Sequence, residues 1–265
     1  MLLLFLAEIT MEEKKIPLLE FDENRTAKMR PENFSSVPKN LPERCVLAFS
    51  HTSVEEIAKK YGATAISQIS SCTCTVPIYL LDVDGTPISL TVGFLGAAGV
   101  AGQIEELVSG GVTKIIACGA AGTLTPKPLG ALVIPNAAVR DEGASFHYAP
   151  PSYEIQADQE VVKRIADTLS GLNLPHVTGK TWTTDAFYRE TEEKIALRRK
   201  QGCITVEMEC SSMIAVARFR GAKFGQIIYC GDDLSGDGYD SRNFHEAKEV
   251  RRNLVEYALQ CVKDL

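Results

Sequence analysis

Two acidic clusters in the second half of the chain have the residue types that sugar chemistry requires. Val206-Glu207-Met208-Glu209 leads into an apolar helical stretch, and Asp232-Asp233 follows directly after a buried strand. In open α/β sheets, ligands bind at the carboxyl ends of the strands, where the second cluster is expected. One carboxylate there can hold the hydroxyl groups of a sugar diol, and a second carboxyl, if protonated, can give its proton to a leaving group.

An alternation of apolar strands and amphipathic helices positions these clusters. Strands are expected at residues 45–49, 79–83, 88–92, 115–118, 132–135 and 224–230, and helices at residues 54–61, 161–169 and 243–262, around residues 105–107, and after Glu209 as far as Gly221. The Asp84-Gly85 pair between two strands predicts a tight hairpin turn. The alternation predicts an α/β fold built as a three-layer α/β/α sandwich.

The composition is that of an ordinary globular chain of 265 residues, 45% hydrophobic and 23% charged. No long linker divides it, so residues 16–265 are predicted to form a single domain. The net charge of −6 argues against nucleic acid as a partner, because such binding depends on clustered Lys and Arg. The eight cysteines are scattered without Cys-x-x-Cys spacing, which favours reduced thiols in the cytoplasm and no metal site.

The first 15 residues are predicted to be an extension of this domain. The apolar run at residues 1–6 lacks the positively charged start and the small-residue cleavage site of a secretion signal, and it is too short to span a bilayer. The segment is therefore expected to be disordered, or to result from a start assigned too early, with Met11 as the natural first residue. No membrane partner is expected.

Three segments carry a resemblance to a known family. They are residues 140–148 (Arg-Asp-Glu-Gly-Ala-Ser-Phe-His-Tyr), residues 184–188 (Thr-Asp-Ala-Phe-Tyr) and residues 206–209 (Val-Glu-Met-Glu). Through them, the chain from about residue 45 onward resembles the nucleoside phosphorylase superfamily of uridine phosphorylases, purine nucleoside phosphorylases and related nucleosidases. The first segment is most similar to uridine phosphorylases. The resemblance implies a central mixed sheet, no cofactor, and a homo-oligomer, either a dimer or a hexamer.

The resemblance also implies roles for individual residues. Glu209 is expected to bind the 2′ and 3′ hydroxyls of ribose, with Met208 packed on the sugar and Phe187 against the base. Asp232 falls where purine-cleaving members place the acid that protonates N7, so it is expected to bind the base and to act in catalysis. That role requires a raised pKa, from burial or from the neighbouring acid. Trp182 is also expected near the base.

The side chains that hold phosphate in the family are missing. Ser53 and Ala117 stand where arginines are expected, and Ala120 replaces a phosphate-binding threonine. Charge-assisted hydrogen bonds contribute about 1.5–3 kcal/mol each, so losing three partners costs about 5 kcal/mol or more, over a thousandfold in affinity. The glycine-rich loop at Gly96 still offers backbone amides. The sequence therefore predicts a degenerate site for phosphate or water.

The leading hypothesis is an enzyme that cleaves the N-glycosidic bond of a nucleoside, and two acceptors remain open. Water fits the missing arginines, with Glu55 or Glu56 as candidates to activate it. Phosphate fits only where another basic group, such as Arg140, Arg189 or His51, reaches the site.

The base and the presence of catalysis are open as well. Thr191 and Glu193 stand where uridine phosphorylases read uracil with Gln and Arg, so uridine is not supported, whereas Asp232 favours a purine or another base. The alternative from a different class is a non-catalytic nucleoside-binding protein of the same fold. A purely structural relic is a third possibility.

Overall fold

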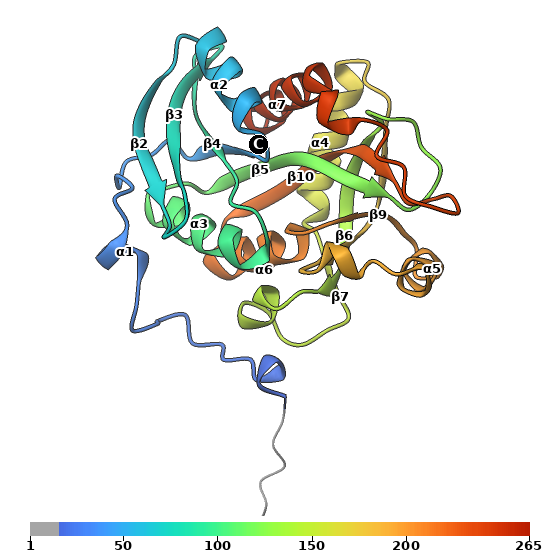
Figure 1. Ribbon diagram of the computed structural model, residues 1–265. Helices are drawn as coiled ribbons and strands as arrows, with labels where there is room; N and C mark the ends of the chain where they lie inside the picture. Colours follow the sequence, from blue (N-terminus) through green and yellow to red (C-terminus); the bar gives the residue numbers. More distant parts are fainter. Residues whose placement is uncertain (1–15) are drawn as a thin grey trace, which may run out of the picture.

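The computed structural model describes residues 16–265, so the predictions for residues 1–15, including the start at Met11, lie outside the described residues. The 10 strands of this part form one mixed sheet in the order β10-β6-β8-β9-β5-β1-β4-β3-β2, with β7 paired to β6 (Figure 1). The predicted α/β class and central mixed sheet are confirmed.

The predicted strands and helices are present, and the structure adds strands at residues 64–70, 154–156, 176–184 and 203–207 and helices at residues 31–34 and 192–200. The strands are β1 (Arg44–Ala48), β2 (Thr64–Ser70), β3 (Thr75–Val83), β4 (Thr86–Val92), β5 (Lys114–Thr123), β6 (Leu132–Asp141), β7 (Glu154–Gln156), β8 (His176–Thr184), β9 (Cys203–Glu207) and β10 (Lys223–Asp233). The α-helices are α1 (Pro31–Phe34), α2 (His51–Lys60), α3 (Ala97–Ser109), α4 (Gln159–Gly171), α5 (Glu192–Lys200), α6 (Cys210–Arg220) and α7 (Lys248–Lys263). Short 3-10 helices are η1 (Pro17–Leu19), η2 (Ala144–His147), η3 (Phe187–Arg189) and η4 (Phe244–Glu246).

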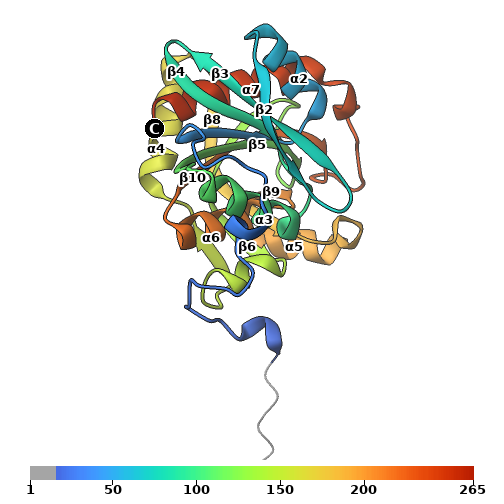
Figure 2. The same ribbon diagram turned by 90° about the vertical axis from the view of Figure 1, so that its left-hand side faces the viewer.

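Helices cover both faces of the sheet, as predicted for a three-layer sandwich. Helices α2, α4 and α7 pack on one face, where α7 contacts β1 and β5. Helices α3 and α6 pack against each other on the opposite face, as the two views show (Figures 1 and 2). The core between these layers is mainly apolar, and the buried polar side chains include a group beside α6.

The sheet also closes on itself, which the sequence does not reveal. β10 pairs with β5 in parallel and with β6 antiparallel, and β5 pairs with β9 antiparallel. Together with the β6–β8 and β8–β9 pairings, these contacts join β5, β9, β8, β6 and β10 in a ring. The ring places the ends of β9 and β10 on either side of β5, and these ends carry the two acidic clusters.

Local backbone geometry follows the turn residues. Asp84 and Gly85 both have positive φ, 52° and 80°, as a two-residue hairpin turn requires, so the predicted hairpin is confirmed. At the carboxyl terminus, the last helix begins at Lys248 and not at residue 243 as predicted. Asn243 has a φ of 48°, in the left-handed region, so an α-helix cannot start there.

None of the helices described within residues 16–265 is long and apolar enough to cross a membrane. All eight cysteines are free thiols, and six of them are buried. The described residues contain no group of three or more His, Cys, Asp or Glu side chains placed to hold a metal ion.

Candidate functional site

The carboxyl group of Glu209 lies at the amino end of α6, two residues after β9. The residue is only 6% exposed, and its Oε1 accepts a hydrogen bond of 2.7 Å from the backbone amide of Gly96. Gly96 precedes α3, and its φ of 85° lies in the left-handed region that favours glycine. The loop between β4 and α3 therefore fixes the orientation of the predicted ribose-binding carboxylate.

Glu207 holds the backbone that carries Glu209. Its Oε2 accepts hydrogen bonds from the amides of Glu209 and Cys210, at 2.8 and 2.6 Å, and its Oε1 accepts one from the Thr183 hydroxyl at 2.6 Å. The first amides of a helix have no partner within the helix. Glu207 thus caps α6 from the preceding strand, and the partly buried Met208 is held between the two acids.

The segment of residues 140–148 forms a buried polar layer beneath α6. Glu142 accepts hydrogen bonds of 2.9 Å from the Ser211 hydroxyl and from the amide of Ser145. Arg140 donates to the Ser145 hydroxyl and, through its other nitrogens, to oxygen atoms within residues 149–152. Because its guanidinium is engaged by its own loop, Arg140 is not the extra basic group that a phosphate would need.

Burial sets the protonation of the two acids before α6. Burial raises the pKa of Glu209 to about 8, the charge of Glu207 adds to the rise, and the Gly96 amide opposes it. Burial likewise raises the pKa of Glu207 to about 7, against the lowering effect of the Thr183 hydroxyl and the helix amides. The two carboxyls therefore hold a proton between them near neutral pH, and hydroxyl groups that donate to Glu209 favour its ionised form.

Asp232, at the end of β10, has the electrostatics of a proton donor. Its backbone carbonyl accepts a hydrogen bond of 2.9 Å from Arg242, whose guanidinium lies 3.8 Å from the carboxylate of Asp233. The Asp232 carboxyl itself makes no hydrogen bond to another described residue. Burial raises its pKa, Asp233 adds to the rise, and Arg242 and His245 oppose it. The raised pKa that a general acid requires is therefore present.

β5 brings the two acidic clusters together. At Gly122 it pairs with Val206 of β9, while β10 runs along its other side. A Cβ atom on Gly122 would stand 2.9 Å from Val206 Cγ1 and 3.6 Å from Asp232 Oδ1, so both side chains lie on the same face of β5. Two strand spacings of about 4.8 Å each therefore separate the backbones of β9 and β10 across β5.

The connection between β8 and α5 carries the predicted base platform. Phe187 is 47% exposed and Tyr188 is 88% exposed, with ring centroids 4.1 Å apart. Asp185 Oδ2 accepts a hydrogen bond of 2.9 Å from the amide of Gly143, and its charge contributes to the raised pKa of Glu209. Phe187 thus has an accessible face near the acidic site, and its contact with a base stays a prediction.

Trp182 does not have the position that the sequence suggests. Its side chain is fully buried in a cluster with Leu124 and Val139, and its indole nitrogen donates to Asp141 Oδ2 at 3.0 Å. The guanidinium of Arg198 lies 5.2 Å from the centre of the indole ring. The expected contact with a base is therefore wrong, because the indole belongs to the packing between β8 and α5 and offers no exposed surface.

Phe49 fills the region where the sequence predicts a degenerate phosphate or water site. A Cβ atom on Gly93 would stand 2.6 Å from Cε1 of the Phe49 ring, and one on Gly119 would stand 3.2 Å from its Cδ2. The ring therefore lies over the backbone just after β4 and over the middle of β5. Ala117 is buried in β5, and Ala120 lines the same small cavity as Phe49.

The backbone amides of this region are mostly used within the protein. In the loop that follows β4, the amides of Gly93, Phe94 and Gly96 donate to Ala48, Gln103 and Glu209, respectively. Ser53, which replaces an arginine, is buried and accepts a hydrogen bond of 2.9 Å from the hydroxyl of Ser50, the residue before α2. Glu55 and Glu56 are exposed on α2.

Replacing Gly93 with alanine should lower the free energy of unfolding by about 2 kcal/mol, because the new methyl group overlaps the Phe49 ring and Leu47. Phe49→Ala alone should cost about 3 kcal/mol through the cavity it leaves. Phe49→Ala removes part of the overlap that Gly93→Ala creates. In urea unfolding, the variant with both changes should therefore lose at least about 1 kcal/mol less free energy of unfolding than the two single variants lose together. Additive losses would mean that the ring does not lie over Gly93.

Glu190 is a candidate site residue that the sequence predictions missed. It follows η3, and its backbone amide donates to the carbonyl of Phe187 at 3.2 Å. Burial raises the pKa of Glu190 to about 7, and the charge of Asp232 adds to the rise. The two acids therefore lie close enough to interact. The one available signal was its position three residues after the predicted base platform.

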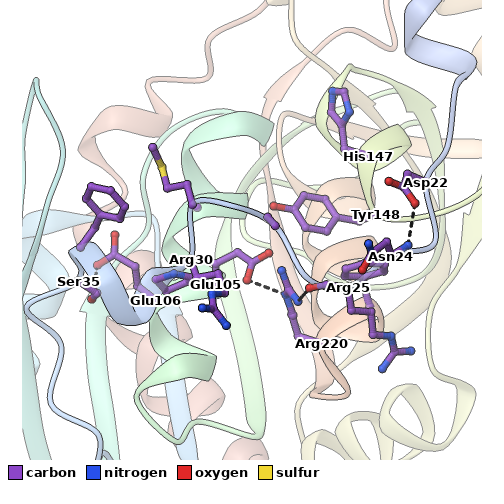
Figure 3. A pocket seen from close by; sticks show the side chains of 16 residues that line it. Asp22, Asn24, Arg25, Arg30, Ser35, Glu105, Glu106, His147, Tyr148 and Arg220 are labelled. Atoms are coloured by element: carbon purple, nitrogen blue, oxygen red, sulfur yellow. Dashed lines mark hydrogen bonds and ion pairs between the residues drawn. The ribbon is translucent and has the colours of Figure 1, made fainter.

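A cavity of about 430 Å³ lies elsewhere, between the N-terminal segment and helices α3 and α6 (Figure 3). Arg220 pairs with Glu105 at 2.7 Å in its wall and donates to the carbonyl of Arg25. None of the predicted site residues lines this cavity, so it is not part of the candidate site.

Nucleoside phosphorylases of named specificity match this chain over stretches of different length. A guanosine phosphorylase from Halorubrum lacusprofundi is 26% identical over 179 residues, which cover 67% of this chain and 74% of that protein. A uridine phosphorylase from Thermococcus kodakarensis is 37% identical over a shorter stretch of 105 residues, 39% of this chain and 38% of that protein.

Solved structures share the fold. A uridine phosphorylase from Vibrio fischeri superposes with a TM-score of 0.74 at 23% identity, covering 85% of this chain and 93% of that one. The purine nucleoside phosphorylase of Toxoplasma gondii, solved with immucillin-H, superposes with a TM-score of 0.70 at 21% identity, covering 89% and 95%. The sequence model of the phosphorylase superfamily matches residues 43–265, and the chain therefore belongs to this superfamily.

Proposed function

We propose that this protein cleaves the N-glycosidic bond of a nucleoside and transfers the sugar to water. One observation carries the proposal: the buried Glu209 and the proton donor Asp232 lie at strand ends on either side of β5. Membership of the phosphorylase superfamily, whose characterised relatives include guanosine and uridine phosphorylases, supports the same substrate class.

In the proposed reaction, the bond between C1′ and the base nitrogen breaks, and its electron pair moves to the base. Asp232 gives its proton to the base, which makes the base a better leaving group. When the ribose hydroxyls bind, Glu209 releases its proton to solvent. The resulting carboxylate accepts hydrogen bonds from these hydroxyls and stabilises the positive charge that develops on the sugar. A water oxygen then bonds to C1′ and releases a proton, which restores Asp232.

Water is the proposed acceptor because uncharged side chains replace the ones expected to hold an anion. Arg251 lines the small cavity beside Phe49 and Ala120, but its guanidinium donates to the backbone carbonyls of Phe244 and His245. Ser53, Ala117 and Ala120 supply no charge, and the ring of Phe49 lies against the backbone at Gly93 and Gly119. Three amides of the loop after β4 already have acceptors within the protein. An anion as large and as strongly hydrated as phosphate needs several donors to replace its water shell. A neutral water molecule does not.

The remaining features of the proposal are the base contact and the setting of the enzyme. Phe187 offers its exposed ring to the base, and Met208 packs on the sugar. As in the prediction from the sequence, the enzyme is proposed to need no cofactor and to form a homo-oligomer. A reducing compartment such as the cytoplasm fits its eight free thiols.

A nucleoside panel incubated with the protein in phosphate-free buffer tests this proposal. Chromatography should show free base and free ribose accumulating over many turnovers from at least one nucleoside. Calorimetric binding of a nucleoside without any product would instead establish a non-catalytic binding protein. If no purine or pyrimidine nucleoside binds or gives a product, the result contradicts both the enzyme and the binding protein.

A further inference from the structure

A small cavity lies beside Phe49, where the chain passes from β1 to α2, and its opposite wall is formed by β10 and α7. Its volume is about 10 Å³, close to the space that one water-sized particle needs. Most of its lining is apolar side chain or backbone. The lining side chains that carry oxygen or nitrogen atoms are Ser50, Tyr229 and Arg251. We call this space the Tyr229 cavity.

The hydroxyl group of Tyr229 is buried in this cavity without a partner. The side chain is 0% exposed, and its oxygen makes no hydrogen bond to any residue of the described chain. Burial and, to the smallest extent, the charge of Asp232 raise the pKa of Tyr229, against the lowering effect of Arg251. The hydroxyl therefore keeps its proton near neutral pH and can donate it in a hydrogen bond. Because a buried hydroxyl without a partner costs free energy, a molecule that accepts from it stabilises the fold.

Arg251 brings a cation to the same cavity. Its guanidinium donates to the backbone carbonyls of Phe244 and His245, and it forms no ion pair with an acid of residues 16–265. A guanidinium has five N–H donors, so these bonds do not use all of them. The positive charge of Arg251 is thus neither neutralised by a carboxylate nor fully hydrogen-bonded.

The amino end of α2 adds to the positive potential. Ser50 is the residue before this helix, and its hydroxyl accepts from the amide of Ser53 and donates to the hydroxyl of the same residue. The first amides of a helix have no acceptor inside it, and the helix dipole favours negative charge at that end. The dipole of α2 and the guanidinium of Arg251 therefore both attract an anion to the Tyr229 cavity.

These polar groups suit an anion better than a water molecule. A bound water molecule needs acceptors for its own protons, whereas a guanidinium and the first amides of a helix only donate. An anion accepts from all of these groups and from the Tyr229 hydroxyl. Size selects further, because a monatomic anion such as chloride is only slightly larger than water. Phosphate, with four oxygens around its phosphorus, is too large for a cavity of about 10 Å³.

We propose that the Tyr229 cavity binds a small monovalent anion of the chloride type, which accepts hydrogen bonds from the Tyr229 hydroxyl and the Arg251 guanidinium. These two donors come from β10 and α7, and neither stands at a position where the sequence leads us to expect a phosphate ligand. The anion is not the acceptor of the proposed reaction, so this site exists whether or not a nucleoside is cleaved.

Crystals soaked in sodium bromide test the site directly, because bromide binds where chloride does and scatters X-rays anomalously. Wild-type crystals should show an anomalous peak within hydrogen-bond distance of the Tyr229 hydroxyl and the Arg251 guanidinium. The peak should weaken severalfold in Tyr229→Phe. A water molecule in the cavity of bromide-soaked wild-type crystals, with no anomalous peak, would overturn the proposal, and so would a phosphate bound there after a soak in phosphate.

Thermal unfolding tests the same site in solution. Replacing sodium gluconate by sodium chloride at constant ionic strength should raise the Tm of the wild type by about 2 °C or more, because only the folded state has the site. Tyr229→Phe and Arg251→Gln should show less than half of this rise. Tyr239→Phe, the same change at an exposed tyrosine, should respond as the wild type does.

The gluconate buffer provides a check on the fold of the main variant. There, Tyr229→Phe should be at least as stable as the wild type, because it keeps the buried ring and removes a hydroxyl without a partner. An equal rise of Tm with chloride in the wild type and in Tyr229→Phe would contradict an anion at this hydroxyl.

Discussion

Glu209→Gln should lower kcat/KM for nucleoside cleavage by about a thousandfold while the protein stays folded. Two charge-assisted hydrogen bonds to the ribose diol are worth about 1.5–3 kcal/mol each, so losing them costs about 3–6 kcal/mol, or a factor of about 10² to 10⁴. Glutamine keeps an oxygen that accepts the Gly96 amide, so the loop before α3 retains its contact. Steady-state kinetics with the best nucleoside of the panel measures the effect.

The large loss follows from where Glu209 lies. The carboxyl is buried, and its pKa is raised to about 8, so the free site favours the neutral acid. As positive charge develops on the sugar, the ionised form becomes favourable in a place where water does not screen it. The amide of Gln cannot ionise, so it cannot stabilise this positive charge in the same way. Glu249→Gln, an exposed change on α7, is the matched control, and thermal unfolding verifies that both variants fold. Activity of Glu209→Gln within threefold of wild type would contradict the assigned role.

Asp232→Asn should lower the cleavage of purine nucleosides by about 10² to 10⁴, the usual contribution of a positioned general acid. The effect should depend on the leaving group. A ribose derivative of p-nitrophenol departs without protonation, so its hydrolysis should lose less than about tenfold. Comparing the two substrates separates lost proton transfer from general damage to the site.

The pH dependence has a defined sign. Asp232 donates only while it is protonated, and its pKa is raised above the ordinary range of an aspartate. Cleavage of purine nucleosides by the wild type should therefore fall as pH rises through this elevated pKa, and Asp232→Asn should lack that decline. Asp237→Asn, an exposed change in the loop that follows β10, should behave as wild type. If Asp232→Asn cleaves purine nucleosides at the wild-type rate, Asp232 does not act as the proton donor.

The sequence predicts best where burial and turn chemistry produce regular patterns. The strands β1, β5 and β10 are mainly apolar runs, and the hairpin at Asp84-Gly85 has the residues that its positive φ angles require. β8 and α5 show no such pattern. The first half of β8 is largely exposed, and Arg198 is the one buried residue of α5, so neither carries an apolar stripe.

The errors at the site have a common cause. Trp182 stands close in sequence to the predicted base platform, but alternation along β8 turns its indole toward α5, where Asp141 accepts its N–H. Glu190 looks like one polar residue among several, and the acid that adds to its raised pKa, Asp232, is more than 40 residues further along the chain. The closure of the sheet brings them together, and closure depends on pairings of distant strands that no local pattern records.

The identity of the acceptor tests the account most directly. The measurement is the sugar product of nucleoside cleavage, identified by mass spectrometry, together with the cleavage rate, with and without inorganic phosphate. The Phe49 ring and the missing cations predict free ribose as the sole sugar product and the same rate in both conditions. Ribose 1-phosphate formed only when phosphate is present, with cleavage that depends on phosphate, would contradict the account.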